Sequence, residues 1–334
     1  MKISLDVFGG DNAPIEILKG AIAAKAEYDI ELALCGSTVE MLRVAKDAGL
    51  SLEGLELIEA GSVIDMHDEA KAVLRQKADS SMAVALKMVA DGKADAVVSA
   101  GSTGAFLMGA TMIIKRIKGI KRPALGAIMP GTAGPYILVD CGANAEVRPE
   151  MLNQFGLMGS VYMKNVLKVN SPKVALANNG AEETKGTDLQ RDAYLLLKNN
   201  KDVEFCGNVE GRDIPSGEYQ VIVADGFSGN LILKTVEGTA SFTFGMLKDM
   251  FTKNLFSKLG AVLLGSGLRE LRQKMDYTEY GGAPLIGLKQ PAVKAHGSSN
   301  ANAIKNAIRQ AMQWASSGVT EEIQKAVAGN EDDE

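Results

Sequence analysis

Short apolar segments that end in small polar residues and continue as helix-like patterns recur along this sequence of 334 residues. In the clearest case, the run VIVA at 221–224 is followed by DGFSGN at 225–230 and by a helical pattern from Leu231. A short run rich in β-branched residues is typical of a buried strand. We interpret seven further segments in the same way, at 2–7, 31–36, 55–60, 94–100, 136–139, 173–177 and 292–295.

Strands that alternate with helices need crossover connections, and these favour a mostly parallel sheet with helices on both faces. The sequence therefore predicts one α/β domain of three layers, α/β/α, over residues 1–328. The last residues, 329–334, are mostly acidic, and we expect them to form a disordered tail.

The ends of the predicted strands carry more polar residues than tight turns need. Ligands of parallel α/β sheets bind outside the carboxyl ends of the strands, and free N–H groups at helix starts bind anions. Tight turns after strands would need only glycine, which adopts their backbone conformations. The segments after the predicted strands also contain Asn144, Lys185, Asn230 and His296. The sequence therefore predicts an anion site suited to phosphate. Its candidate binding residues are Gly9, Gly10, Asp11, Gly101, Ser102, Thr103, Gly142, Gly229 and Ser298.

Composition and missing motifs exclude several other classes of protein. The net charge of −5 gives no basic field for nucleic acid. The three cysteines lack the spacing of a metal site or a disulfide framework, which fits a reducing cytoplasm. The sequence has no P-loop and no GxGxxG after a strand, and only His67 and His296 are available as the base of a Ser–His–Asp triad. We expect neither a cofactor nor a metal.

Residues 115–122, KRIKGIKR, form the densest basic patch of this acidic chain. One interpretation is a solvated helix end. The other is a docking site for an acidic partner or an anionic lipid surface. The candidate docking residues are Lys115, Arg116, Lys118, Lys121 and Arg122.

A long helical pattern without a strand interrupts the alternation between residues 231 and 276. Gly260 and the glycines at 265 and 267 could let this segment bend into a hairpin. Apolar residues interleaved with lysines near the bend suit a membrane surface, whereas a dimer interface or a core helix is the alternative. The stems could also lie in a dimer while the tip touches lipid. The candidate tip residues are Phe251, Leu255, Phe256, Leu259 and Leu263.

The order of these motifs resembles the bacterial PlsX family of acyl-ACP:phosphate acyltransferases. The resemblance spans nearly the whole chain and rests on the collective spacing of short motifs. They include GGD at 9–11, SAGSTGA at 99–105, DCGAN at 140–144, DGFSGN at 225–230 and HGSS at 296–299. The chain departs from the family at Val7 and Phe8, where Ala and Met are expected, and at Ser102, where Asn is usual.

The resemblance implies transfer of a long-chain fatty acyl group from acyl carrier protein to inorganic phosphate. The product, an acyl phosphate, would serve glycerol phosphate acylation in phospholipid synthesis. The resemblance also implies a fold similar to phosphotransacetylases and isocitrate-dehydrogenase-like enzymes. A homodimer, peripheral attachment to the membrane and contact with a downstream membrane acyltransferase are further expectations. Because acyl carrier protein is acidic, the patch at 115–122 would be its dock.

Phosphate is already an anionic nucleophile at neutral pH, so this reaction needs positioning and oxyanion stabilisation more than a strong base. In our hypothesis, Lys185 and backbone amides near Gly142 and Gly229 hold phosphate. Asn144 and Asn230 orient phosphate or the thioester carbonyl. His296 donates a proton to the leaving thiolate or a hydrogen bond to the oxyanion, unless it only bonds to neighbouring backbone.

Other functions remain open from the sequence. A phosphotransacetylase that acts on short acyl-CoA would share the fold and the phosphate chemistry but would not need the apolar hairpin. A non-catalytic binding module would keep the anion site without turnover. A dehydrogenase is a third alternative, but it would need a nicotinamide site, which the motifs do not indicate.

Overall fold

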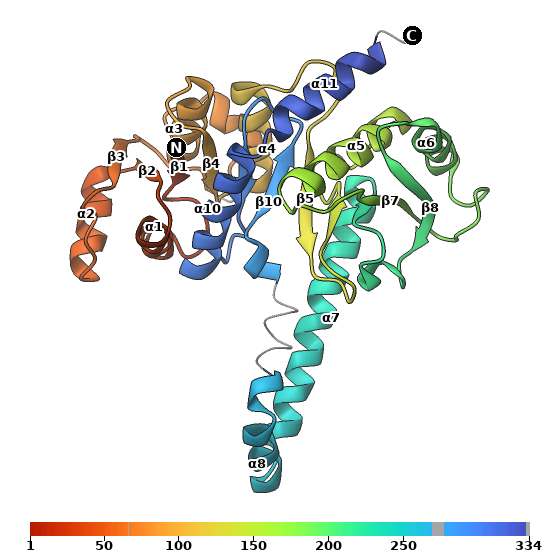
Figure 1. Cartoon of the computed structure of the whole chain (residues 1–334). Coiled ribbons are helices and arrows are strands. Elements are labelled where there is room, and N and C mark those ends of the chain that lie inside the picture. Colours follow the sequence, from red (N-terminus) through yellow and green to blue (C-terminus); the bar gives the residue numbers. More distant parts are fainter. Residues whose placement is uncertain (66, 269–276, 332–334) are drawn as a thin grey trace.

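One mixed sheet forms the centre of the computed structural model, which describes residues 1–65, 67–268 and 277–331 (Figure 1). The strand order is β3-β2-β1-β4-β11-β10-β5-β6-β9-β7-β8. In chain order the strands are β1 (Lys2–Asp6), β2 (Glu31–Gly36), β3 (Glu56–Glu59), β4 (Ala96–Ser99), β5 (Ala124–Met129), β6 (Tyr136–Val139), β7 (Lys173–Asn178), β8 (Glu204–Glu210), β9 (Val221–Val223), β10 (Ala283–Ile286) and β11 (Ala292–Lys294).

The sheet consists of two parallel blocks that run in opposite directions. Strands β3, β2, β1, β4 and β11 pair in parallel, and so do β6, β9, β7 and β8. Between the blocks, β10 and β5 pair antiparallel with their neighbours. The prediction of a mostly parallel sheet is confirmed, but β5, β8 and β10 were not predicted. Because the blocks are opposed, their carboxyl ends point in opposite directions, and not all the predicted loops meet at one edge.

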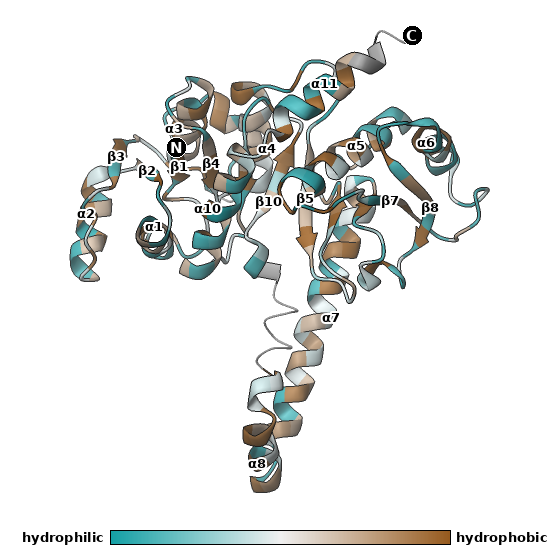
Figure 2. Ribbon diagram, in the orientation of Figure 1, coloured by the Kyte–Doolittle hydropathy of each residue, from teal (hydrophilic) through white to brown (hydrophobic). Residues whose placement is uncertain are grey.

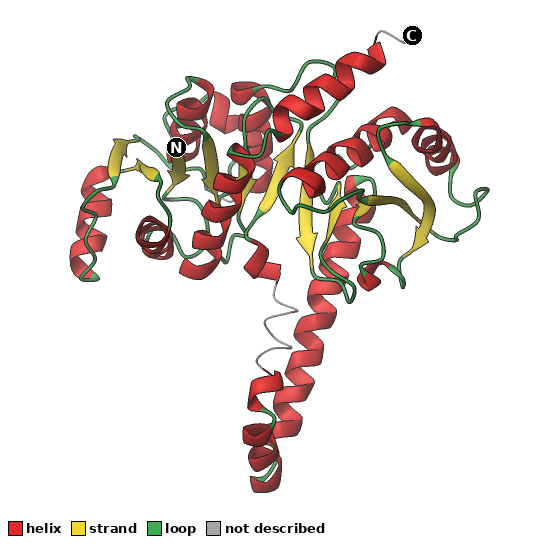
Figure 3. Cartoon of the chain, viewed as in Figure 1, coloured by secondary structure: helices red, strands yellow, loops and turns green. Residues whose placement is uncertain are grey.

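Helices cover both faces of the sheet, which confirms the three-layer α/β/α architecture (Figure 3). Successive strand residues point to opposite faces. In β6, Ile137 and Val139 belong to one apolar core, whereas Tyr136 and Leu138 belong to the other. The first core is closed by α1 (Ile15–Glu27), α2 (Thr38–Asp47), α5 (Pro149–Asn165), α6 (Asp188–Asn199), α10 (Ala301–Ala315) and α11 (Val319–Glu331). The second is closed by α3 (Ser81–Ala90), α4 (Thr103–Gly109) and α7 (Gly226–Thr252).

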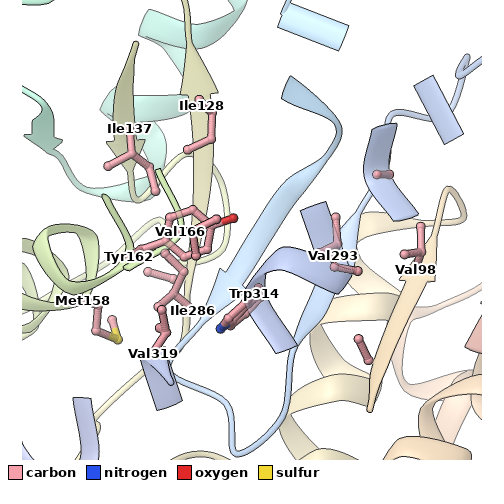
Figure 4. Packing of buried hydrophobic residues seen from close by; sticks show 14 of the residues in the cluster. Val98, Ile128, Ile137, Met158, Tyr162, Val166, Ile286, Val293, Trp314 and Val319 are labelled. Carbon is pink, nitrogen blue, oxygen red and sulfur yellow. The ribbon is translucent and has the colours of Figure 1, made fainter. Parts of the chain in front are cut away.

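Aromatic packing at the middle of the first core joins α5 and α10 to the region where the sheet reverses direction. Tyr162 and Trp314 pack edge to face, with 5.7 Å between their ring centroids. Ile286 of β10 and Val293 of β11 belong to the same cluster (Figure 4). Large buried aromatic side chains contribute much of the apolar area that a core removes from water, so this contact fixes the two helices over β10 and β11.

The long helix α7 begins earlier than the sequence suggested. The Asp225 side chain accepts the N–H of Ser228 at 2.8 Å and caps the helix at its N-terminus. Residues 226–230, which we expected as a loop before the helix, therefore form its first turns. Figure 1 shows that α7 projects far beyond the sheet, with α8 (Leu255–Leu263) packed at its far end.

The helices α7 and α8 are separated at residues 253–254, and Gly260 lies inside α8. A second break follows at Leu264, beside the predicted glycine at 265. Asn254 accepts the N–H of Ser257 at 2.9 Å, and this cap starts the new helix. Residues 269–276 of the predicted hairpin lie outside the described residues. No helix in the described part of the chain is long and apolar enough to cross a membrane.

The structure also contains short helical turns, and the end of α11 differs from our prediction of a disordered tail. The Ser80 side chain accepts the N–H of Ala83 and caps α3, so this helix begins at Ser81, separate from the short turn at Ala70–Leu74. Residues 329–331, which we expected in a disordered tail, continue α11, and 332–334 lie outside the described residues. The short turns are η1 (Ala70–Leu74), η2 (Ala110–Ile114), η3 (Ile214–Ser216) and η4 (Tyr277–Tyr280).

Candidate active site

A cavity of about 500 Å³ lies where the first parallel block meets β5, β6 and α7. Polar and charged side chains reach it from the ends of strands and from α7, and apolar side chains come mainly from β5. Its polar lining residues are Asp11, Thr103, Asn230, Lys234, Glu237, Lys294 and His296. Its apolar lining includes Leu125, Ala127, Ile128, Met129, Leu233 and Ala283. The cavity can therefore hold a charged group and an apolar group side by side.

Three loops from β1, β4 and β11 meet closely at this cavity. A Cβ on Gly9 would lie 2.3 Å from Oδ2 of Asp6 and 2.7 Å from the backbone nitrogen of Gly101, so only glycine fits there. Gly10 has a φ of +105°, which also favours glycine. The N–H of Asp11 donates to the carbonyl of Gly297 at 2.8 Å. The structure thus brings these predicted residues together beside His296.

The ring of His296 is oriented by Ser298. Nδ1 accepts the backbone N–H of Ser298 at 3.2 Å and lies 2.8 Å from its Oγ. Since Nδ1 is an acceptor, the neutral ring carries its proton on Nε2. Burial, and next the charge of Lys234, lower the pKa of His296 from its usual 6.5. The neutral ring at pH 7 suits a hydrogen-bond donor to an oxyanion better than it suits a donor of a full proton.

One face of α7 forms another wall of the cavity. Asn230, Leu233, Lys234 and Glu237 are spaced at i, i+3, i+4 and i+7, so they share this face. Nζ of Lys234 lies 2.7 Å from Oε2 of Glu237. Lys234 and Glu237 were not predicted, although their helical spacing from Asn230 could have indicated them.

The loop at 140–144 is held by the buried carboxylate of Asp140. Its Oδ1 accepts the N–H groups of Leu125 and Ala143, and its Oδ2 accepts the backbone and side-chain N–H groups of Asn144 at 2.6 and 3.0 Å. Burial raises the pKa of Asp140, and these hydrogen bonds oppose that rise. The Asn144 amide also donates to the carbonyl of Pro123 at 2.8 Å. Asn144 therefore fixes the loop and does not line the cavity.

Gly142 and Gly229 occupy different positions around this loop. Gly142 lines the cavity with a φ of +134°, and a Cβ there would lie 3.8 Å from Oδ1 of Asn230. The N–H of Gly229 donates to the carbonyl of Asp225 within α7, so it offers no free amide to phosphate. A Cβ on Gly229 would lie only 1.9 Å from the Asp140 carbonyl oxygen. Gly229 thus permits close packing of α7 against the loop.

Lys185 and Ser102 do not line the cavity. Lys185 follows β7 in the second parallel block, whose strands run opposite to β1 and β4, and its Nζ lies 4.0 Å from Glu182. Ser102 occupies the position before α4 without a side-chain capping bond. The contacts that we predicted between these two residues and phosphate remain predictions. The lining of this cavity does not support them.

A second hollow, of about 900 Å³, is lined by all five candidate docking residues. Arg148 and Lys289 add two more cations, and Met112, Ile117, Ile120 and Met151 add an apolar surface. The Arg116 guanidinium donates to the carbonyl of Ile120 at 3.2 Å and to that of Lys121. Arg116 therefore also holds the loop, and it is exposed, as are Lys118, Lys121 and Arg122.

The far end of the hairpin is rich in hydrophobic residues (Figure 2), and several of their side chains are exposed. The exposed fractions are 81% for Leu255, 85% for Phe256, 58% for Leu259 and 76% for Leu263. Phe251 is half-buried. Contiguous exposed apolar residues of this kind mark surfaces that contact a partner or a lipid.

The α/β fold of the chain is similar to that of solved phosphotransacetylases. The solved structure of the EutD phosphotransacetylase from Staphylococcus aureus superposes with a TM-score of 0.65, at 19% identity over 94% of each chain. The family described as "Fatty acid synthesis protein" matches residues 1–322. The phosphate acyltransferase of Alkaliphilus oremlandii is 47% identical over 100% of this chain and 99% of the relative. That of Thermoanaerobacterium thermosaccharolyticum is 46% identical over 98% and 97%.

The chain therefore belongs to this fatty acid synthesis family, the PlsX family that its motifs resemble. Its curated relatives are phosphate acyltransferases, and the expected likeness to phosphotransacetylases is confirmed at the level of the fold.

The electrostatics of His296 can be tested directly. We expect the ring to titrate with a pKa below 6.5, because burial and the charge of Lys234 both disfavour the imidazolium. Replacing Lys234 with Met should raise this pKa, since a neighbouring cation is removed and Glu237 remains. Nuclear magnetic resonance of the ring protons, assigned with a His296→Gln variant, measures both values. A pKa above 6.5, or a fall in Lys234→Met, would contradict this account.

Proposed function

We propose that this chain transfers a long-chain fatty acyl group from acyl carrier protein to inorganic phosphate and forms an acyl phosphate. Membership of a family whose relatives are phosphate acyltransferases supports the reaction class. The cavity supports the chemistry, because it combines His296, Asn230 and two lysines with an apolar wall on β5. This combination is the observation that carries the proposal.

The reaction begins when an oxygen of hydrogen phosphate attacks the carbonyl carbon of the thioester. The carbonyl electron pair moves onto oxygen, where Nε2–H of His296 and the side-chain amide of Asn230 donate hydrogen bonds to the oxyanion. Collapse of this intermediate breaks the carbon–sulfur bond. The departing thiolate takes up the proton that phosphate loses, so the products are an acyl phosphate and the free thiol of the carrier. Holding phosphate beside the thioester supplies most of the required positioning.

Release of free thiol from palmitoyl-acyl carrier protein, with and without phosphate, tests this function. We expect phosphate-dependent release and an acyl product that hydroxylamine traps. His296→Ala should lower kcat by about 100- to 1000-fold, the usual effect of removing one oxyanion donor. Near-wild-type turnover of that variant would remove His296 from the mechanism. Activity with acetyl-CoA alone would favour a phosphotransacetylase, and no activity with either thioester would favour a binding module.

The basic hollow at 111–122 fits an acidic carrier protein. Helix α4 and η2 connect Thr103 at the cavity with the start of this hollow, and twelve helical residues span on the order of 18 Å. The prosthetic arm of the carrier would have to cover that separation. Exposed cations around an apolar surface would attract the carrier and orient it.

Charge reversal tests this docking site. Lys118→Glu with Lys121→Glu should raise the KM for acyl carrier protein by about tenfold and weaken its dependence on salt, while kcat changes little. We exclude Arg116 from this variant because it holds the loop. Lys46→Glu with Lys93→Glu makes the same change in net charge elsewhere and should leave the KM unchanged. Equal KM values for the two double variants would contradict the docking site.

The hairpin supports attachment to a membrane surface, with the stem of α7 in a homodimer. Phe242, Met246 and Met250 are exposed along the stem, and the exposed residues of α8 lie at the tip. Apolar side chains near Lys253 and Lys258 suit the interface of an anionic bilayer. A tip at the surface would deliver the acyl phosphate to a membrane acyltransferase. The mass from sedimentation velocity decides whether the chain is a dimer.

Vesicle flotation tests the tip. The triple variant Leu255→Ser, Phe256→Ser, Leu259→Ser should lose most binding to phosphatidylglycerol vesicles, because it removes three large exposed apolar side chains of α8, among them its two most exposed. Val39→Ser with Leu42→Ser changes exposed apolar residues on α2 and should bind as the wild type does. Undiminished flotation of the triple variant would exclude the tip as the membrane contact.

A further inference from the structure

Lys294 is a buried cation on the wall of the cavity that the sequence did not single out. It ends β11, where it follows Ala292 and Val293, and only 7% of it is exposed. A buried ammonium is costly unless it is paired or used, so its presence in an apolar strand calls for a reason. The same residue lines the cavity beside His296.

Across the sheet, Lys294 lies in register with Ser99, which lies in register with Asp6. Residues in register on neighbouring parallel strands face the same side, so Asp6, Ser99 and Lys294 form a polar row. Both carboxylate oxygens of Asp6 are occupied, with Ser81 Oγ at 2.6 Å from Oδ1 and Ser99 Oγ at 2.6 Å from Oδ2. Burial raises the pKa of Asp6, and these two hydrogen bonds and the charge of Lys294 oppose that rise. The ionised form of the carboxylate in turn favours a protonated Lys294.

Charged and titratable groups face Lys294 from three further places. Asp11 comes from the loop after β1, His296 from the end of β11, and Lys234 and Glu237 from α7. Burial lowers the pKa of Lys294 to about 8, while the charges of Asp6 and Asp11 oppose that shift and Lys234 adds to it. Most Lys294 side chains are therefore protonated at pH 7.

The hydrogen bonds of Lys294 leave two of its three donors for a ligand. Among residues 1–65, 67–268 and 277–331, its ammonium donates only to the carbonyl of Ala295 and has no salt-bridge partner. Lys234, the other cation of the cavity, is already paired with Glu237. Asp6 lies in the same polar row, two strands away on β1, and supports the charge through space without taking up these donors.

We propose that Lys294 is a catalytic residue that binds inorganic phosphate, and that Asp6 is the positioning residue that keeps its ammonium charged. The proposal rests on the proposed phosphate acyl transfer. A phosphate dianion in a partly apolar cavity requires a cation with free donors, and Lys294 supplies it. From the end of β11, two residues before His296, it would hold phosphate next to the group that stabilises the oxyanion.

Kinetics in phosphate provide the first test. Lys294→Met keeps the length and apolar stem of the side chain and removes the charge, so the KM for phosphate should rise at least tenfold. The KM for the acyl carrier should stay within about twofold. Lys93→Met removes an exposed cation remote from the cavity and should behave as the wild type does. An unchanged KM for phosphate in Lys294→Met would overturn the proposal.

The pH profile distinguishes positioning by Asp6 from a merely structural role. Protonated Lys294 is the active form, so kcat/KM for phosphate should fall as the pH rises through about 8. Asp6→Asn removes the charge that raises the pKa of Lys294, and the fall should therefore begin at lower pH. If Asp6→Asn lowers kcat/KM at every pH but the fall still begins at the same pH as in the wild type, Asp6 has a structural role only.

A labelling experiment on the wild-type protein needs neither a variant nor an acyl donor. Reductive methylation with formaldehyde, read by peptide mass, should modify Lys294 several-fold more slowly in phosphate than in chloride of equal ionic strength. Lys93 should react equally in both. Equal labelling of Lys294 would overturn the proposal. Protection of Lys294 without phosphate-dependent thiol release would leave the phosphate site standing and reject the acyl transfer.

Discussion

The reversal of strand direction at β10 and β5 is the constraint on which the rest of this structure depends. If all the strands were parallel, every loop after a strand would lie at one edge of the sheet. Here β10 and β5 separate two opposed parallel blocks, and the cavity lies at their junction. It is therefore walled by strand ends of one block, by the start of α7 from the other, and by β5 between them. That geometry places polar groups beside an apolar surface, which the proposed acyl transfer would require.

Two buried carboxylates hold the loops on either side of this cavity. Asp6 accepts the hydroxyl groups of Ser81 and Ser99 under the loops of β1 and β4. Asp140 accepts N–H groups of Leu125, Ala143 and Asn144 at the end of β6. Burying a carboxylate costs free energy that its hydrogen bonds only partly offset. Both carboxylates lie beside the cavity and not in the middle of an apolar core. The fold therefore gives up some stability there to hold the loops in a fixed arrangement.

Glycine permits these loops to approach one another. The absence of a side chain at Gly9 lets the loop after β1 lie against Asp6 and Gly101, and at Gly229 it lets α7 pack against the Asp140 carbonyl. The first contact forms part of the cavity, whereas the second only fixes a helix. Both glycines occur in motifs of small polar residues that follow a strand. The sequence therefore does not show which glycine forms part of the cavity and which one only fixes a helix.

Much of the fold follows from local pattern. Short apolar runs identified β1, β2, β3, β4, β6, β7, β9 and β11, and the long helical pattern identified α7 and α8. β10 could not be recognised in this way, because it contains Pro284, a residue that argues against a strand inside a sheet. Of the glycines expected to let the hairpin bend, Gly260 is tolerated inside α8, whose start is set by the capping bond of Asn254.

The sequence by itself determined the alternation of strands and helices, the family, and the presence of polar residues after strands, because these depend on neighbours along the chain. Only the tertiary structure decided which of those residues share a site. It joined Asp11, Asn230 and His296, turned Asn144 inward to Asp140, and left Lys185 on the opposed block. It also added Lys294, whose significance arises from Ser99 and Asp6 on two other strands. The direction of strands far apart in sequence sets these contacts, and no local pattern encodes that direction.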